Sequence, residues 1–135
     1  MNNLSDKIVP INVAIGKEGY MELPIDVSLD DVIDKIYEKR IYEGSNVVRV
    51  KLIKLSDLLN LVDIKPEVLK LDCEGCEWDI INEDYPTLKL FKELGIECHM
   101  RHRDLRVLLD NFSKDFKCKV INAFYGRMIL HCIRK

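Results

Sequence analysis

Three carboxylates and two cysteines follow a short apolar run near the middle of the chain. The run Val68–Leu71 leads directly into residues 72–77, which read Asp-Cys-Glu-Gly-Cys-Glu. Ligands in open α/β sheets bind at the carboxyl ends of strands, and glycine lets a backbone approach closely. We therefore predict that Asp72, Glu74 and Glu77 belong to a site. The alternative is that they only complement the dipole of a helix that begins here.

An acid and an imidazole alternate on a second predicted strand, residues 96–100. Glu97 and His99 are two positions apart, so both side chains point to the same face of that strand. Such a pair suits proton transfer, because histidine titrates near neutral pH. We predict that these two residues meet Asp72 and Glu74 in one pocket, since both stretches end apolar strands that should be neighbours.

The same pocket would also suit a divalent metal ion. Carboxylate oxygens with a single imidazole favour Mg²⁺ or Mn²⁺ over Zn²⁺, although the sequence does not identify the metal. A purely structural role is the alternative for His99. For His102 and His131 we predict only that structural role.

Cys73 and Cys76 form a Cys-x-x-Cys pair where the predicted helix begins. Thioredoxin-like proteins place a reactive thiolate in this way. Here the neighbouring carboxylates would raise a thiol pKa, so a redox role is disfavoured. A zinc site is also disfavoured, because no second Cys-x-x-Cys pair supplies the remaining ligands. Five cysteines are an ordinary count for a protein of a reducing compartment.

The elements that position these residues alternate between strands and helices. Strand patterns cover residues 8–15, with a short paired return at 20–25, and residues 47–55, 68–71 and 96–100. Helix patterns begin at Ser28, at Ser56, after Glu77 and at Asp104, and Pro86 should break the third. Residues 118–124 and 128–133 form a predicted hairpin that turns at Tyr125-Gly126. This order predicts an α/β fold whose partly parallel sheet ends in an antiparallel hairpin.

Composition narrows the class of protein. The 135 residues favour one domain, and 47% hydrophobic with 33% charged residues excludes a disordered chain. A net charge of -2 gives no basic footprint for nucleic acid. No apolar run is long enough to span a membrane, and the first residues do not resemble a signal peptide. We therefore expect a cytoplasmic protein that binds neither nucleic acid nor membrane.

The motifs occur in an order that resembles the later portion of FkbM-type S-adenosylmethionine-dependent methyltransferases. The resemblance covers about residues 8–99. It implies a truncated Rossmann-like sheet of the class I methyltransferase kind and methyl transfer to a hydroxyl, often on a sugar or secondary metabolite. The segments that carry it are 11–16 (Ile-Asn-Val-Ala-Ile-Gly), 55–59 (Leu-Ser-Asp-Leu-Leu), 69–77 (Leu-Lys-Leu-Asp-Cys-Glu-Gly-Cys-Glu) and 96–99 (Ile-Glu-Cys-His).

In that family the acidic stretch lines the active-site pocket. The resemblance therefore implies roles for particular residues, with S-adenosylmethionine as the cofactor. The implied roles are catalytic for Asp72, Glu74, Glu97 and His99, cofactor-binding for Asp72 and Gly75, and substrate-binding for Glu77.

The glycine-rich cofactor loop of such enzymes has no counterpart here, because the sequence contains no Gly-x-Gly-x-Gly. We expect residues 1–135 to form one methyltransferase-like domain without the first strand-loop-helix unit. The chain alone should then bind S-adenosylmethionine weakly. The strand before Asp72 should have an unpaired edge, or the early strand should fill it. An exposed edge invites pairing, so we expect a homo-oligomer or a completing partner chain.

Three functional interpretations remain open. We favour a truncated or divergent FkbM-like methyltransferase that methylates a hydroxyl of a sugar or small metabolite, with a small-molecule or glycan acceptor. The second is a non-catalytic binding or assembly module built on the same fold. The third is a metal-dependent enzyme that uses the acidic pocket.

Overall fold

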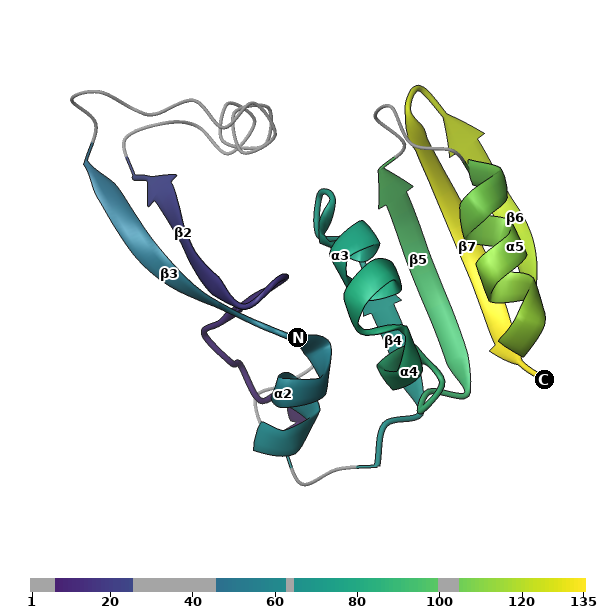
Figure 1. The fold of residues 1–135 in the computed structure, drawn as a ribbon, viewed down its shortest axis with the longest axis horizontal. Coiled ribbons are helices and arrows are strands. Elements are labelled where there is room, and N and C mark those ends of the chain that lie inside the picture. Colours follow the sequence, from purple (N-terminus) through teal and green to yellow (C-terminus); the bar gives the residue numbers. More distant parts are fainter. Residues whose placement is uncertain (1–6, 26–45, 63–64, 100–104) are drawn as a thin grey trace.

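The computed structural model describes residues 7–25, 46–62, 65–99 and 105–135, which form two sheets and four helices (Figure 1). The fold is therefore mixed α/β, as the sequence predicts. The predicted helix that begins at Ser28 and the predicted helix start at Asp104 lie outside the described residues. A single sheet is wrong for the described residues, because the strands divide into a three-stranded and a four-stranded sheet.

The three-stranded sheet is centred on β3 (Val47–Ile53), which lies between β1 (Ala14–Ile15) and β2 (Gly19–Pro24). β1 runs parallel to β3 and β2 runs antiparallel to it, so the predicted pairing of the first two strands with each other is wrong. Of the predicted strand 8–15, only the last two residues form a strand. Pro10 has no N–H to donate, and the Val13 N–H donates to the Ile11 carbonyl at 3.1 Å in a tight turn.

Helix α2 (Leu55–Leu61) follows β3 directly. Its N-cap is Lys54, and the Asp57 carboxylate accepts the Lys54 N–H at 3.4 Å. The predicted cap at Ser56 is therefore wrong. The Ser56 N–H instead donates to the buried Asp84 side chain at 2.8 Å, which ties α2 to the segment between α3 and α4.

The four-stranded sheet has the order β4-β5-β7-β6. β4 and β5 are parallel, and the other pairs are antiparallel. The predicted turn at Tyr125-Gly126 is confirmed, with Gly126 at a φ of 68° that favours glycine. The strands are β4 (Val68–Leu71), β5 (Glu93–His99), β6 (Phe116–Phe124) and β7 (Arg127–Arg134).

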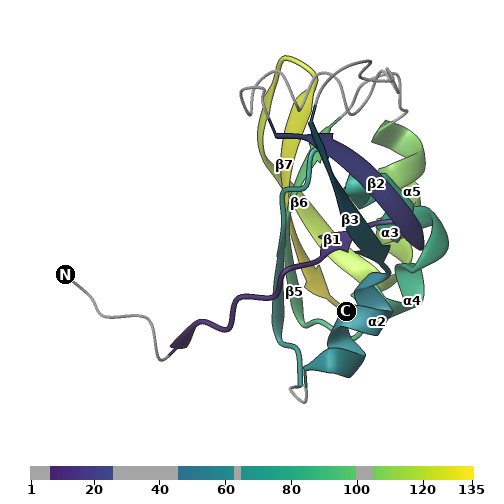
Figure 2. The same cartoon turned by 90° about the vertical axis from the view of Figure 1, so that its left-hand side faces the viewer.

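Helices α3 (Cys76–Glu83), α4 (Tyr85–Leu88) and α5 (Leu105–Asp115) lie on one side of the four-stranded sheet (Figure 2). The core fills the space between them and the strands. Pro86 does not break a continuous helix as predicted, because α3 already ends at Glu83. Proline lies in the first turn of α4, where its missing N–H costs nothing. The fully buried core side chains include Leu94, Ile96, Leu108, Phe112 and Leu130.

Strand β4 is the terminal strand of the four-stranded sheet among the described residues. Val68, its first residue, is 65% exposed. The predicted unpaired edge is therefore present, whereas filling by the early strand is wrong, because β1 pairs with β3. A homo-oligomer or partner chain that covers this edge stays a prediction.

Four of the five cysteines form disulfides. Cys118 lies directly opposite Cys132 in the β6–β7 register, and this pair is bonded. The second bond joins Cys73 to Cys76, and Cys98 remains a buried thiol. Reduced cysteines were expected from their number, because the spacing of the cysteines does not show which pairs meet in the fold. Disulfides persist in oxidising compartments and are rare in the cytoplasm. The cytoplasmic location therefore stays a prediction, and the two disulfides are evidence against it.

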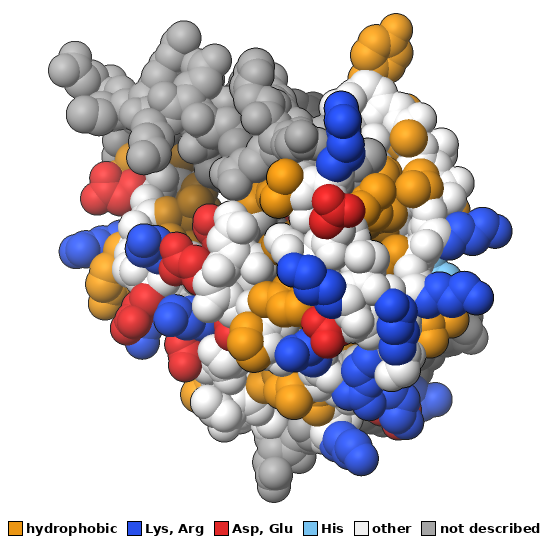
Figure 3. Space-filling model, turned by 45° about the vertical axis from the view of Figure 1, so that its right-hand side comes forward, with side chains coloured by type: hydrophobic (Ala, Val, Ile, Leu, Met, Phe, Trp, Pro, Cys, Tyr) orange, Lys and Arg blue, Asp and Glu red, His pale blue; other side chains and the backbone are white. Residues whose placement is uncertain are grey.

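The surface around α5 mixes charged and apolar side chains (Figure 3). Lys and Arg side chains gather toward the lower right of that face, with hydrophobic side chains between them. No helix in the described part of the chain is long and apolar enough to cross a bilayer.

Candidate functional site

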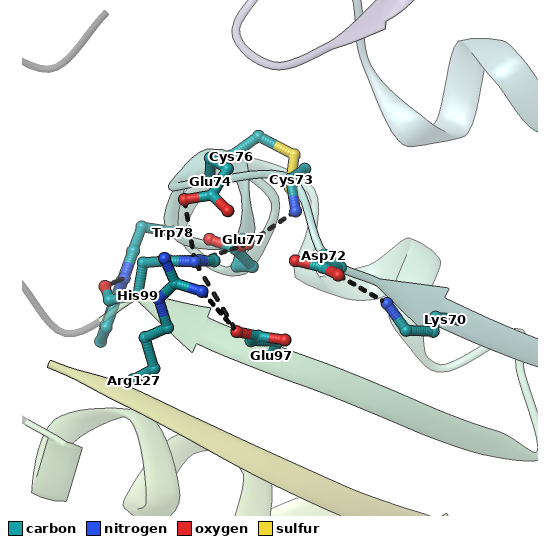
Figure 4. Close-up of polar contacts among 10 residues, drawn as sticks. All are labelled: Lys70, Asp72, Cys73, Glu74, Cys76, Glu77, Trp78, Glu97, His99 and Arg127. Atoms are coloured by element: carbon teal, nitrogen blue, oxygen red, sulfur yellow. Dashed lines mark hydrogen bonds and ion pairs between the residues drawn. A yellow bond between two sulfur atoms is a disulfide. The ribbon is translucent and has the colours of Figure 1, made fainter. Parts of the chain in front are cut away.

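Two parallel strands bring acidic side chains to the same edge of the four-stranded sheet. In the register of β4 and β5, Leu71 pairs with Ile96, so Asp72 and Glu97 follow one position later on neighbouring strands. His99 lies two residues beyond Glu97, at the end of β5. One potential ligand atom from each of Asp72, Glu97 and His99 lies within 4.8 Å of the others (Figure 4).

The loop between β4 and α3 places a third acid, Glu74, next to these residues. Glu74 has a φ of 53°, and among the described residues it is the only non-glycine residue with a positive φ. Gly75 has a φ of 122° and is the N-cap of α3. The disulfide between Cys73 and Cys76 closes this loop. Backbone strain of this kind gathers at functional sites, where the surrounding structure maintains it.

His99 is the centre of the cluster and is only 6% exposed. Its Nδ1 lies 3.3 Å from Glu77 Oε1, and its Nε2 lies 2.9 Å from Glu74 Oε2. The Trp78 indole N–H donates to the His99 backbone carbonyl at 2.8 Å. The imidazole is therefore held from the α3 side and meets carboxylates at both ring nitrogens (Figure 4).

Glu77 lies beneath the cluster and is completely buried. Its Oε1 accepts the Cys73 N–H at 3.0 Å, whereas Oε2 has no hydrogen bond among the described residues. His99 Nε2 is likewise buried without an aligned hydrogen bond, although Glu74 lies within hydrogen-bonding distance. Buried polar atoms rarely lack hydrogen bonds, so two of them on neighbouring side chains make this cluster the candidate functional site.

Negative charge exceeds positive charge in this cluster. Lys70 Nζ lies 3.0 Å from the Asp72 carboxylate, and Arg127 Nη1 lies 3.4 Å from Glu97. These are two cations for four carboxylates within the described residues of Figure 4. Both cations are exposed and partly screened by water, so they neutralise the exposed Asp72 and the partly exposed Glu97 only weakly.

Cys98 adjoins the cluster but is not a nucleophile. Burial raises the pKa of its thiol to about 12, and the negative charge of Glu77 adds to that rise. The thiol therefore keeps its proton near neutral pH, and its side chain belongs to the core.

The structure thus brings together Asp72, Glu74, Glu97 and His99. Gly75 begins α3 beside them. Their chemical roles stay predictions. Glu77 was expected at the substrate, but its buried side chain contacts Cys73 and His99 instead.

Sequence reasoning missed two neighbours of the cluster. Trp78 was not predicted to lie at the site, although it follows Glu77 directly in the sequence. Arg127 reaches the cluster because β7 pairs His99 with Arg127. No local pattern marks that contact, which depends on the register of strands far apart in sequence.

Comparison with known families gives one match. The model of the methyltransferase FkbM domain matches residues 2–118. That segment contains every residue of the cluster except Arg127. No curated protein and no solved structure matches the chain.

Proposed function

We propose, from the premise that the chain belongs to the methyltransferase FkbM domain family, that it takes part in methyl transfer to a hydroxyl of a sugar or small metabolite. The observation that carries this proposal is the strained Glu74 beside the buried His99. A positive φ holds the Glu74 carboxylate 2.9 Å from the imidazole at the carboxyl edge of β4 and β5. This is the place where open α/β sheets bind their ligands.

The cofactor of the proposed reaction is S-adenosylmethionine, which supplies the methyl group when bound. The donor set fits one property of this molecule, because its sulfonium is a cation and the cluster has an excess of carboxylates. Asp72 and the backbone at Gly75 are the groups that would hold it. Because the sequence has no glycine-rich cofactor loop, we propose that this chain alone binds S-adenosylmethionine weakly.

Glu74 is the residue that we propose to accept the proton of the acceptor hydroxyl. As the new C–O bond forms and the S–CH₃ bond breaks, this hydroxyl must release its proton. The Glu74 side chain is 28% exposed, whereas His99 Nε2 is buried. An entering hydroxyl therefore meets the Glu74 carboxylate first. A positioned base of this kind contributes about 10²–10⁴ in rate.

The proposed fold class is Rossmann-like. Its support is that β4 and β5 are parallel and that α3 and α4 form the connection between them. Such a strand-helix-strand crossover is the unit from which these sheets are built.

Methyl transfer can be tested with the full chain and S-adenosylmethionine that carries an isotopically labelled methyl group. The cofactor is supplied at about 1 mM, because we expect it to bind weakly. A dissociation constant near 1 mM corresponds to a binding free energy of only about -4 kcal/mol. A panel of sugars and small polyols serves as acceptors, and mass spectrometry detects labelled products. Labelled methyl ether supports the proposal. Binding of an acceptor without any methylated product would instead favour a non-catalytic module.

A further inference from the structure

We propose that Asp72, Glu97 and His99 form a binding site for a divalent cation, Mn²⁺ or Mg²⁺. The geometry of the cluster alone supports this site. Its part in methyl transfer, described below, rests on the proposed function.

The three side chains already have nearly the separation that one ion requires. Their potential ligand atoms lie within 4.8 Å of one another. Octahedral ligands at about 2.1 Å from a central ion are about 3.0 Å apart when adjacent and about 4.2 Å apart when opposite. At most one pair of three ligands can be opposite, so side-chain movements of about 1–2 Å would bring these atoms to the spacing of a coordination shell.

A second observation points to a ligand at the same place. His99 Nε2 is buried and faces the acids, and Glu74 Oε2 lies 2.9 Å from it without the alignment of a hydrogen bond among the described residues. On the opposite side of the ring, Glu77 Oε1 lies 3.3 Å from Nδ1. Histidines that bind metals are usually fixed in this way, with a carboxylate on the nitrogen that does not face the metal. Orientation of His99 would explain why the carboxylate of Glu77 is completely buried.

The charge balance favours the same conclusion. Within the described residues of the cluster, four carboxylates face the cations of Lys70 and Arg127. The four carboxylates and two cations alone leave a formal excess of two negative charges, which a divalent ion would neutralise. The nearby sulfurs of Cys73 and Cys76 are bonded to each other and supply no thiolate. The remaining oxygen and imidazole donors suit Mn²⁺ or Mg²⁺ better than Zn²⁺.

The cation defines a class of acceptor. Three protein ligands leave about three positions of an octahedral shell open. Two adjacent hydroxyls can fill two of these positions, so a vicinal diol such as that of a sugar ring is the acceptor that fits. A bound cation also lowers the pKa of a coordinated hydroxyl, which would help it to lose its proton to Glu74. Glu74 would have to turn away from His99 Nε2 to allow this.

Calorimetric titration of the full chain with MnCl₂ tests the site without any need for activity. We expect saturable binding near one equivalent, which MgCl₂ displaces. Asp72→Asn and Glu97→Gln should each weaken binding at least about tenfold, whereas the control Glu83→Gln on exposed α3 surface should not. Equal affinity in all four proteins, or no saturable binding, would overturn the proposal.

Paramagnetic broadening provides a measurement that does not depend on variants. Substoichiometric Mn²⁺ should broaden the NMR signals of His99 and leave those of His131, which pairs with Glu93 elsewhere on the sheet, sharp. Uniform broadening would contradict the site. Binding at His99 with methyl transfer unaffected by EDTA would keep the site but overturn its role in the reaction. Methyl transfer without any Mn²⁺ binding would overturn the site and leave the proposed function intact.

Discussion

Replacing Glu77 with alanine should lower the free energy of unfolding by about 1–3 kcal/mol. This carboxylate lies at the base of the cluster, where it accepts the Cys73 N–H at 3.0 Å and faces His99 Nδ1 at 3.3 Å. The side chain is completely buried, so water cannot replace either contact. Its removal would leave the part-buried Cys73 N–H and the buried His99 Nδ1 without this partner.

The magnitude follows from opposing contributions. The charge-assisted hydrogen bond from the Cys73 N–H is worth about 1.5–3 kcal/mol, and an unpaired His99 Nδ1 costs about 1 kcal/mol more. Alanine returns a few tenths of a kcal/mol through its higher helix propensity. Removal of Oε2, which has no hydrogen bond, stabilises the variant by roughly 1 kcal/mol, because this polar atom no longer has to be buried. Glu77→Gln keeps an acceptor at the Oε1 position, so we expect a loss of only about 1 kcal/mol.

Urea unfolding monitored by the fluorescence of Trp78, the single tryptophan, provides the measurement. Glu83→Ala is the matched control, because Glu83 is on the same helix and, among the described residues, its side chain forms an exposed ion pair with Lys17. Its effect should stay within about 0.5 kcal/mol. A Glu77→Ala loss no larger than that of the control would refute the reasoning, since Glu77 would then not hold His99 in place.

The core and the cysteines lead to three further expectations. Burial raises the pKa of Cys98 to about 12, so iodoacetamide at neutral pH should modify it only after unfolding, as judged by mass spectrometry. Because that pKa is raised in the folded state, the free energy of unfolding should also fall above about pH 8.5, by up to about 1.4 kcal/mol per unit. Replacing Cys118 and Cys132 with serine should cost about 3 kcal/mol in urea unfolding for a bridge with a sequence separation of 14, and an unchanged midpoint would contradict this. Phe112→Ala, at a fully buried ring, should cost about 3–5 kcal/mol, and a loss below about 1 kcal/mol would mean that the core is packed differently.

Local patterns predicted the four-stranded sheet well. The run Val68–Leu71 is β4 without adjustment, and the turn at Tyr125-Gly126 joins β6 and β7. Alternating apolar residues and a glycine in a tight turn act over only a few positions. Such signals can be recognised without knowing the rest of the fold.

Pairing partners were harder to predict. The early strand was expected beside residues 20–25, but both β1 and β2 pair with β3. The alternation of a strand shows which face is buried and does not show which neighbour it will have. The division into two sheets has the same origin, because it depends on contacts between distant segments.

The candidate site shows the same limit. Asp72 and His99 could be brought together from sequence, because the carboxyl ends of parallel strands meet at one edge. The complete burial of Glu77 and the contact of Arg127 with Glu97 could not be foreseen. Both depend on how α3 and β7 pack onto β5, which no short stretch of sequence encodes.

The most direct test of the account is the rate of methyl transfer in three proteins at saturating S-adenosylmethionine: the wild type, Glu74→Gln and Glu83→Gln. With a vicinal-diol acceptor, we predict that Glu74→Gln lowers the rate about 10²-fold or more, because the amide cannot accept the hydroxyl proton. Glu83→Gln should match the wild type, since Glu83 lies away from the cluster on α3. Equal rates in all three proteins would contradict the claim that the acidic cluster activates the acceptor.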